Sequence, residues 1–492
     1  MTEVAAPTDV VVVGAGPVGL MLAGELARAG VGVVVLERRD VPSTASRAST
    51  LHARTMEIFD SRGLLPRFGS PPAEPRGHFG GIPMDLTLPS SHPGQWKVPQ
   101  TSTESVLQQW ALALGADIRR GVEVVELVQE PGQARVRTVG RAGHAEIPAS
   151  YVVACDGEDS TVRHLLRADF PGQDAVRELL RADVAGIEVR DRRFERLETG
   201  LAIAARRADG VTRVMVHSFA ARVRDRDDEP TFEEISRAWK QVTGEDISAG
   251  TPLWTNGFGD AARQLTRYRH GRVLFAGDAA HRQMPIGGQA LNLGLQDAFN
   301  LGWKLAAVIR GDHGPELLDS YHDERHPVGA AVLSNIRAQA LLLLGGPEVE
   351  PLRAVLAEMI GHEEVRARLA GLISGLDIRY ATGGGKDPLL GARLPPSTLR
   401  VAQDSVTTAA LLRRGGGLLL NLGTGCGAVT ELTGWRDHVT AVSARAEPGS
   451  VLDVPAEAVL VRPDGHVAWT SGTEFSLTEA LTRWFGPPTD RL

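Results

Sequence analysis

The sequence predicts an α/β fold, and three stretches of the 492-residue chain support this prediction. Residues 10–37 have the pattern of a buried β-branched strand, a glycine-rich turn, a helix and a second strand. Residues 151–157 form another apolar strand, which ends in Cys155-Asp156-Gly157. Residues 272–278 form a third, which ends in Gly277-Asp278. In an open α/β sheet, the carboxyl ends of such strands form the ligand crevice.

The turn after the first strand has the spacing G-x-G-x-x-G of a dinucleotide-binding site. Gly14 allows a tight turn, Gly16 lets a pyrophosphate approach the backbone, and Gly19 lets the helix pack closely on the sheet. The helix N-terminus offers unpaired N–H groups to the phosphates. Glu37 ends the second strand, where a carboxylate can accept hydrogen bonds from a ribose. This complete order of elements predicts a dinucleotide site, which the glycines alone would not.

Asp278 is the candidate ligand-binding group of the third stretch. A carboxylate at the end of a buried strand can bind the hydroxyls of a sugar or ribityl chain, although a helix N-cap is the simpler alternative. Pro285, Gly287 and Gly288 then lead into a long helix that begins at Gln289. The N-terminus of this helix can stabilise a negative charge, such as that of a reduced flavin ring.

Composition restricts the class of protein. The 53 basic and 60 acidic residues give a net charge of −7, which disfavours nucleic acid or an anionic membrane as partner. The two cysteines, Cys155 and Cys426, are too few for a disulfide framework or a cysteine metal site, and we expect no metal. We expect no signal peptide and no apolar stretch long enough to span a bilayer. The sequence therefore favours a soluble, cytoplasmic protein.

Periodicity predicts several further elements. Helices are expected at residues 100–114 and 232–242, and at 316–344 with a break only at Pro327. Residues 145–147 and 151–154 are expected to be separate strands. A hairpin is expected around the turn Arg462-Pro463-Asp464-Gly465.

Taken together, the motifs resemble those of a known family. The chain is similar to single-component FAD-dependent aromatic hydroxylases of the p-hydroxybenzoate hydroxylase group. Within that group, the nearest likeness is to bacterial hydroxylases that modify aromatic polyketides of the angucycline and tetracycline kind. The resemblance runs from end to end and rests on Gly14-Ala-Gly-Pro-Val-Gly19, Arg76-Gly-His-Phe-Gly-Gly-Ile-Pro83, Val98-Pro-Gln100, Cys155-Asp-Gly157 with Ser160 and Arg163, Gly277-Asp278, Pro285-Ile-Gly-Gly-Gln289, Asn292-Leu-Gly-Leu-Gln-Asp297, Asn300-Leu-Gly-Trp-Lys-Leu305 and Val461-Arg-Pro-Asp-Gly-His466.

The resemblance implies a set of FAD contacts. The three glycines would hold the pyrophosphate, Glu37 the adenosine ribose, Asp278 the ribityl chain, and residues 288–292 would lie beside the isoalloxazine. Ala290 stands where the family usually has glycine, which could restrict flavin motion or reshape the pocket. The implied contacts are Gly14, Gly16, Pro17, Val18, Gly19, Glu37, Arg38, Arg47, Gln100, Asp156, Gly157, Asp278, Pro285, Gly288, Gln289, Ala290, Leu291 and Asn292.

The resemblance also implies a reaction. NAD(P)H would reduce FAD, O2 would add at the flavin C4a, and the hydroperoxide would transfer oxygen to an electron-rich ring of a polycyclic aromatic substrate. The sequence identifies no catalytic base. His281, Arg282 and His78 are candidates close to the motifs, although each is more simply a structural residue.

Other reactions remain open. Baeyer–Villiger insertion or oxidative rearrangement uses the same cofactor, and a non-redox FAD-binding module is a further alternative. A flavin halogenase is disfavoured, because none of the eight Trp residues forms a W-x-W-x-I-P stretch.

The family likeness implies three domains. A discontinuous, Rossmann-like FAD-binding domain is expected from residues 1–75, 100–172 and 266–380. Residues 76–99 and 173–265 are expected to form a β-sheet substrate domain over the flavin. Residues 389–492 resemble a thioredoxin-like domain, but the absence of C-x-x-C indicates a structural role rather than thiol chemistry. We expect the protein to be a monomer or a homodimer.

Overall fold

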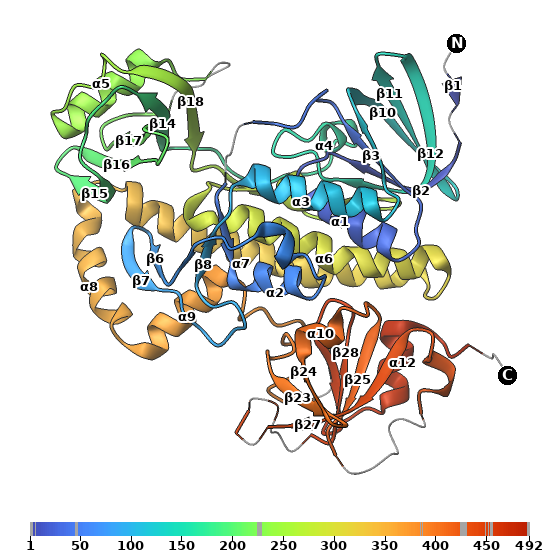
Figure 1. Cartoon of the computed structure of the whole chain (residues 1–492). Helices are drawn as coiled ribbons and strands as arrows, with labels where there is room; N and C mark the ends of the chain where they lie inside the picture. The colour runs from blue at the N-terminus through green and yellow to red at the C-terminus, as the bar shows by residue number, and fades with distance from the viewer. Residues whose placement is uncertain are drawn as a thin grey trace.

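The structure is a computed structural model that describes residues 3–4, 6–44, 48–223, 229–383, 385, 387–423, 431–447, 449–450, 452 and 456–489. It has the mixed α/β fold that the sequence predicts. Figure 1 shows a blue and teal sheet at one end, a green sheet at the other, long helices between them, and an orange-red C-terminal unit on one side.

The first sheet contains the N-terminal strand. Five parallel strands lie in the order β9, β3, β2, β12 and β21. Strand β11 pairs antiparallel with the first half of β12, and β10 pairs with β11. Its core consists of β-branched residues such as Val10–Val13, which suits strands covered on both faces. The strand bounds are β1 Glu3–Val4, β2 Thr8–Val13, β3 Val33–Glu37, β9 Asp117–Arg120, β10 Val122–Glu130, β11 Gln133–Gly140, β12 Gly143–Ala154, β20 Arg269–His270 and β21 Val273–Phe275.

Strand β12 corrects one expectation, because it runs unbroken through both predicted strands. Pro148 does not end it, since β12 changes partner there. Its first half pairs with β11, with Pro148 opposite Arg135, and its second half pairs with β2 from Ala149 onward. One continuous strand therefore joins an antiparallel meander to the parallel sheet.

Helices α1 and α3 pack together beside the first sheet. A Cβ built on Gly24 of α1 would lie 2.1 Å from the Trp110 ring of α3, so this glycine allows the helices to approach. The helices and 3-10 turns of the N-terminal part are α1 Pro17–Arg28, α2 Ala53–Asp60, η1 Leu65–Phe68, α3 Gln100–Ala113 and α4 Thr161–Leu165.

The second sheet is antiparallel and has the order β15-β16-β17-β14-β18. Helix α5 covers one face, where Ile235 and Trp239 pack against Ala182 and Val214. Residues 76–99 add no strand to this sheet, contrary to expectation, because β6 and β7 pair only with each other and β8 pairs with β4 and β5. The bounds are β4 Thr50–His52, β5 Ala73–Glu74, β6 Arg76–Phe79, β7 Ile82–Asp85, β8 Gln95–Lys97, β13 Gly172–Gln173, β14 Glu178–Ala185, β15 Arg192–Leu197, β16 Gly200–Arg206, β17 Thr212–Ser218, α5 Phe232–Thr243, β18 Thr251–Gly259, β19 Ala262–Gln264 and β22 His281–Arg282.

Two long helices, α6 and α7, run between the sheets (Figure 1). Helix α7 continues through Pro327, so the predicted break there is wrong. The helix is packed on both sides of the proline, since Arg325 before it is fully buried and a Cβ on Gly329 after it would lie 2.5 Å from the Tyr268 hydroxyl. Gln264 Nε2 also donates to the carbonyl of His326 at 2.8 Å. The bounds are η2 Gly277–Ala279, η3 Ile286–Gly288, α6 Gln289–Arg310, η4 Pro315–Leu318, α7 Asp319–Leu344, η5 Pro347–Val349, α8 Glu350–Ile360 and α9 Glu363–Ser374.

One helical segment among the described residues, Pro315–Leu344, is long and apolar enough to cross a membrane by length and composition alone. The sequence-based expectation of no such stretch is therefore wrong. In its most apolar window 44% of the residues are buried inside the protein, where Ile336, Leu343 and Leu344 belong to an apolar cluster.

The C-terminal unit has its own sheet, in the order β26-β25-β28-β29. The predicted hairpin is confirmed, because β28 and β29 are antiparallel and flank the turn at Arg462–Gly465. Cys426 lies outside the described residues. The bounds are β23 Thr398–Val401, β24 Asp404–Thr407, α10 Thr408–Leu412, β25 Gly417–Asn421, η6 Thr433–Trp435, β26 Val439–Ser443, β27 Arg445–Ala446, β28 Ala458–Val461, β29 Val467–Thr470 and α12 Leu477–Phe485.

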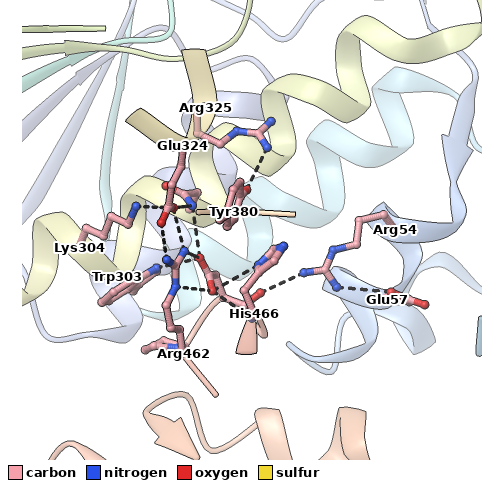
Figure 2. A network of polar contacts seen from close by, with 12 residues as sticks. Arg54, Glu57, Trp303, Lys304, Glu324, Arg325, Tyr380, Arg462 and His466 are labelled. Atoms are coloured by element: carbon pink, nitrogen blue, oxygen red, sulfur yellow. Dashed lines mark hydrogen bonds and ion pairs between the residues drawn. The ribbon is translucent and has the colours of Figure 1, made fainter. Parts of the chain in front are cut away.

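A buried ionic network joins this hairpin to α6 and α7 (Figure 2). The Arg462 guanidinium bonds to the carboxylates of Glu324 on α7 and Asp464 in its own turn. Lys304 Nζ of α6 donates to Glu324 at 2.7 Å, and Asp464 also accepts from Trp303 Nε1 at 3.2 Å. These residues are buried, so the charges compensate one another rather than being solvated.

The pKa values reflect this mutual compensation. Burial alone would raise the pKa of Glu324, but Arg462 and Lys304 lower it to about 2. Burial lowers the pKa of Lys304 to about 8, against the opposing effect of Glu324. Removing one member would therefore leave a charge buried without a partner.

We expect Arg462→Met to lower the free energy of unfolding by about 3–5 kcal/mol, because Glu324 and Asp464 then lose their cation. Urea denaturation followed by circular dichroism measures this. Arg436, which is exposed in the same unit, provides the control. Arg436→Met should change stability by no more than about 0.5 kcal/mol, and equal effects of the two variants would contradict the interpretation.

Candidate functional site

The three predicted motifs meet at one edge of the first sheet. Strand β12 lies between β2 and β21, and its last residue, Ala154, is opposite both Val13 and Phe275. The turns that follow these strands are therefore neighbours. Arg163 connects two of them directly, since its Nη1 donates to the carbonyl of Ala279 at 3.1 Å. Stretches far apart in the sequence thus form one candidate site at the carboxyl ends of parallel strands.

In the glycine-rich turn, Gly14 and Gly19 face tightly packed backbone, whereas Gly16 faces open space. A Cβ on Gly14, whose φ is +103°, would lie 2.4 Å from the Cys155 carbonyl oxygen. A Cβ on Gly19 would lie 2.0 Å from the Gly14 oxygen, whereas one on Gly16 would meet nothing within 4 Å. Two glycines therefore serve packing, and Gly16 leaves space in front of the α1 N-terminus.

Pro17 and Val18 open helix α1, as predicted. Proline suits the first helical position because its missing N–H would have no partner there. The Val18 side chain packs against Gly277 and Gly294, where a Cβ would come within 2.9 and 2.6 Å of its Cγ2. Val18 thereby links the first motif to the third.

The end of β3 carries Glu37. Its carboxylate accepts from the N–H groups of Ala15 at 3.0 Å and Arg39 at 2.9 Å, so it is oriented beside the glycine-rich turn. Arg38 is exposed. Arg47 lies outside the described residues.

Gln100 begins helix α3 and holds the chain near residue 48. Its Oε1 accepts from the Ala48 N–H at 3.2 Å, and its Nε2 donates to Glu104 at 2.8 Å. The backbone N–H of Gln100 also donates to the Ala48 carbonyl at 2.9 Å. Gln100 thus fixes the backbone at Ala48 to the start of α3.

Asp156 lies at the end of β12 and is mostly buried. Burial raises the pKa of its carboxyl, against hydrogen bonds from Ser160 and the Val162 N–H. Its Oδ1 has no hydrogen-bond partner among the described residues. Gly157 follows with φ of +83°, and a Cβ there would meet nothing within 4 Å.

Asp297 of α6 forms hydrogen bonds with the corner that follows β21. This fully buried carboxylate accepts from the Gly277 N–H at 3.1 Å, from His281 Nε2 at 2.8 Å and from Arg325 Nε at 2.7 Å. Asp278 itself is exposed in the short turn η2. Sequence reasoning named Asp297 only as part of a motif, and its role depends on contacts across the fold.

Helix α6 begins after two consecutive glycines in the left-handed conformation, Gly287 and Gly288, with φ of +64° and +70°. The carbonyl of Gly287 pairs with His52 Nε2 at 2.7 Å. Burial lowers the pKa of His52 to about 4, so its ring is neutral at pH 7 and donates through Nε2. Its buried Nδ1 is then an acceptor, with no partner among the described residues.

Asn292 is fully engaged by the protein. Its Oδ1 accepts from the His52 N–H at 2.9 Å and Thr55 Oγ1 at 2.7 Å, and its Nδ2 donates to the carbonyls of Thr50 and Gly288. It thereby ties the start of α6 to β4. Of the neighbouring predicted contacts, Pro285 is exposed, Ala290 and Leu291 are half-buried and Gln289 is buried.

The three catalytic candidates have different surroundings. His281 is fully buried against Asp297. Arg282 is half-exposed, 3.4 Å from Glu158. His78 packs its ring 4.1 Å from that of Phe194, and burial lowers its pKa to about 4. These placements favour structural roles for His281 and His78.

Apolar side chains pack together between the second sheet and α7, beside the turn at residues 285–288. They include Leu179, Leu201, Met284, Ile286, Ile336, Ala340, Leu343 and Leu344. An open cavity of about 710 Å³ adjoins this apolar cluster through Ala340, and most of the residues that line it are polar, including Asp174, Arg177, Asp260 and Arg337. Its volume is within the usual range for small-molecule sites.

The residues present fit a dinucleotide whose ring end reaches α6. The open face at Gly16 suits a pyrophosphate, and Glu37 and Asp278 offer carboxylates for hydroxyl groups. Two buried polar atoms have no partner among the described residues: Asp156 Oδ1, in the turn after β12, and His52 Nδ1, on the ring that contacts the Gly287 carbonyl. Such atoms are satisfied when a polar ligand binds.

Comparison with known proteins finds likeness over the whole chain. Residues 7–336 match the family model described as FAD binding domain, and residues 387–488 match that described as aromatic-ring hydroxylase, C-terminal. A 12-dehydrotetracycline 5-monooxygenase/anhydrotetracycline 6-monooxygenase of Streptomyces rimosus is 42% identical, covering 98% of this chain and 99% of that protein.

Two solved structures are informative. CabE, an aromatic hydroxylase from angucycline biosynthesis, has a TM-score of 0.94 and 47% identity, over 98% of this chain and 100% of its own. PyrE3, a Diels-Alderase in the biosynthetic pathway of pyrroindomycins, has a TM-score of 0.86 and 37% identity, over 98% and 100% of the two chains. The same fold therefore occurs in proteins named for different reactions.

We expect the stability of the protein to depend on His52 between pH 7 and pH 5. The folded pKa of about 4 lies below the unfolded value of 6.5, so the folded state binds fewer protons. The contribution of the neutral His52 ring to the free energy of unfolding is complete above pH 6.5 and is lost as the pH falls toward 4. His52→Gln removes the titration, so from pH 7 to pH 5 it should lose about 2 kcal/mol less unfolding free energy than the wild type.

Urea denaturation at the two pH values measures this difference. His362, which is exposed, provides the control. His362→Gln should follow the wild type, and a His52→Gln variant that does the same would contradict a neutral, buried ring at residue 52.

Proposed function

The chain belongs to the FAD-binding aromatic-hydroxylase family of monooxygenases, and we propose that it hydroxylates a polycyclic aromatic polyketide. The observation that carries the proposal is the meeting of three separate motifs at one sheet edge, next to the apolar cluster. The names of the relatives support the substrate class, since they refer to tetracycline and angucycline compounds. We expect antibiotic biosynthesis as the setting, in the cytoplasm, without a nucleic-acid or membrane partner.

FAD, reduced by NAD(P)H, would supply the activated oxygen. The residues of the chain itself would bind FAD and fix its orientation. The α1 N-terminus, with Gly16 open in front of it, would hold the pyrophosphate. Glu37 would accept from the ribose and Asp278 from the ribityl chain, while residues 288–292 would support the ring.

The apolar cluster would hold the aromatic rings and exclude water near the reacting carbon. The adjoining cavity of about 710 Å³ is large enough for the passage of a multi-ring compound. His52 would remain neutral at pH 7 and act as an acceptor next to the turn at Gly287. No described side chain is assigned as a base, and Arg282 remains a weak candidate.

Two other reactions need discrimination. Baeyer–Villiger insertion or oxidative rearrangement would use the same cofactor with the substrate in another orientation. The likeness to PyrE3 favours a non-oxidative cyclisation as a further candidate, because that protein is named a Diels-Alderase.

We expect a polycyclic phenol to accelerate NAD(P)H oxidation by the purified yellow protein, with a product that gains one oxygen atom and keeps its rings intact. Coupled absorbance and mass spectrometry measure both. A lactone would instead indicate Baeyer–Villiger insertion. An isomer formed without NAD(P)H or O2 would indicate the cyclisation reaction, and either outcome would contradict hydroxylation.

We expect Asp278→Ala to weaken FAD binding by about tenfold or more, because it removes an acceptor for the ribityl hydroxyls. Fluorescence titration of the apoprotein with FAD gives the Kd. Asp323→Ala, at an exposed carboxylate of α7, is the control and should bind FAD as the wild type does. If Asp278→Ala retains full flavin affinity, the ribityl role of Asp278 is wrong.

A further inference from the structure

Three side-chain amides form an unbroken chain between the β6–β7 hairpin and the first residue of α6. The N–H of Gly80, at the hairpin tip, donates to Gln339 Oε1 at 3.2 Å. Gln339 Nε2 donates to Asn335 Oδ1 at 3.4 Å, one turn earlier on α7. Asn335 Nδ2 donates in turn to Gln289 Oε1 at 3.1 Å. These three amides thus connect the β6–β7 hairpin to the proposed flavin side of the molecule.

The polarity of this amide chain is set at its hairpin end. The N and O atoms of an amide side chain exchange places on a 180° flip, so each orientation must follow from its partners. A backbone N–H can only donate, and Gly80 therefore requires an oxygen from Gln339. That choice makes Gln339 a donor to Asn335, and Asn335 a donor to Gln289. The last amide consequently presents its NH2 group, Nε2, away from the chain.

Gln289 Nε2 is a buried donor without a partner. The residue is 3% exposed, and no described atom accepts from Nε2. It lies beside the turn of left-handed glycines, 3.6 Å from the position of a Cβ built on Gly287. His52 contacts the same turn at the Gly287 carbonyl, and its buried Nδ1 is an acceptor without a partner in the described part of the chain. A buried polar atom in this state is satisfied when a ligand binds.

We propose that Asn335 and Gln339 are positioning residues, which hold Gln289 so that its Nε2 donates to an acceptor of the ligand at the Gly287–Gly288 turn. The acceptor is an oxygen or nitrogen of either the flavin ring or the aromatic substrate. This inference rests on the proposed function, because that function places both molecules at this turn. It adds three residues whose side chains set the hydrogen-bonding character of the site.

The hairpin end of the amide chain is firmly held. Arg353 of α8 donates from Nη1 to the carbonyls of Gly80 and Leu342, both at 2.6 Å. A Cβ on Gly80 would lie 2.7 Å from that of Leu342, so the hairpin tip is packed directly on α7. The donor at Gln289 is therefore oriented by contacts made in a different part of the fold.

The test compares Gln289→Leu, Asn335→Leu and Asn335→Asp with the control Ala331→Ser, which changes an exposed residue one turn earlier on α7. Leucine is similar in size to the amide side chain that it replaces, but it forms no hydrogen bonds. Aspartate offers only acceptors, so it should turn the Gln289 amide over and point its oxygen at the ligand. Each variant is prepared as the FAD holoprotein. The measurements are the visible flavin spectrum, the two-electron midpoint potential and the Kd of a polycyclic phenol.

We expect Gln289→Leu and both Asn335 variants to show one of two patterns, with Ala331→Ser unchanged. If the acceptor is on the flavin, the spectrum shifts without substrate, and the ratio of affinities for reduced and oxidised FAD changes by about tenfold, or 30 mV. If the acceptor is on the substrate, the phenol Kd rises by about tenfold with the flavin spectrum unaltered. Either pattern supports the proposal.

A double-mutant cycle tests whether Asn335 acts through Gln289. The effect of Asn335→Leu should disappear when Gln289→Leu is already present. If the effect persists in full, or if the variants leave spectrum, potential and phenol Kd unchanged while the wild type binds FAD, the inference is overturned and the proposed function stands. If the wild type itself binds no FAD, the proposed function fails and this inference fails with it.

Discussion

The Asp297 carboxylate is the contact on which the arrangement of the site depends. It is fully buried on α6 and accepts from the Gly277 N–H, His281 and Arg325. A buried carboxylate is stable only with such a set of donors. The two oxygens of Asp297 therefore join the corner after β21 to helix α7. The position of Asp278 at the sheet edge follows from this geometry.

Buried polar contacts of α7 also reach the C-terminal unit. Arg325 also donates to the Tyr380 hydroxyl at 3.0 Å, and the Tyr380 ring lies 4.3 Å from that of His466. The adjacent residue, Glu324, binds Arg462 (Figure 2). Neighbouring residues of one helix thus connect the cofactor corner to the last hairpin. Among its described residues, the C-terminal unit therefore contributes a set of buried charges and aromatic rings to this connection.

Sequence reasoning succeeded where the signal is local. Fold class, family and the helix beginning at Gln289 are confirmed, because glycine spacing and periodicity depend on neighbouring residues. It failed where distant packing outweighs local preference. Pro327 does not break α7, because the residues before and after it are packed against the fold. The strands predicted at residues 145–147 and 151–154 are one strand, β12, because it pairs with β11 and then with β2. The individual FAD contacts and the domain boundaries remain predictions.

The sequence by itself determined the motifs, since they are properties of residue type and spacing, and through them the family resemblance that implies FAD. Only the tertiary structure decided how these motifs meet. Hydrogen bonds and ion pairs between residues more than a hundred positions apart, such as Arg163 with Ala279 and Arg462 with Glu324, cannot be deduced from spacing. The orientation of Gln289 is a further case, because it depends on a donor at Gly80 and on two side chains of another helix.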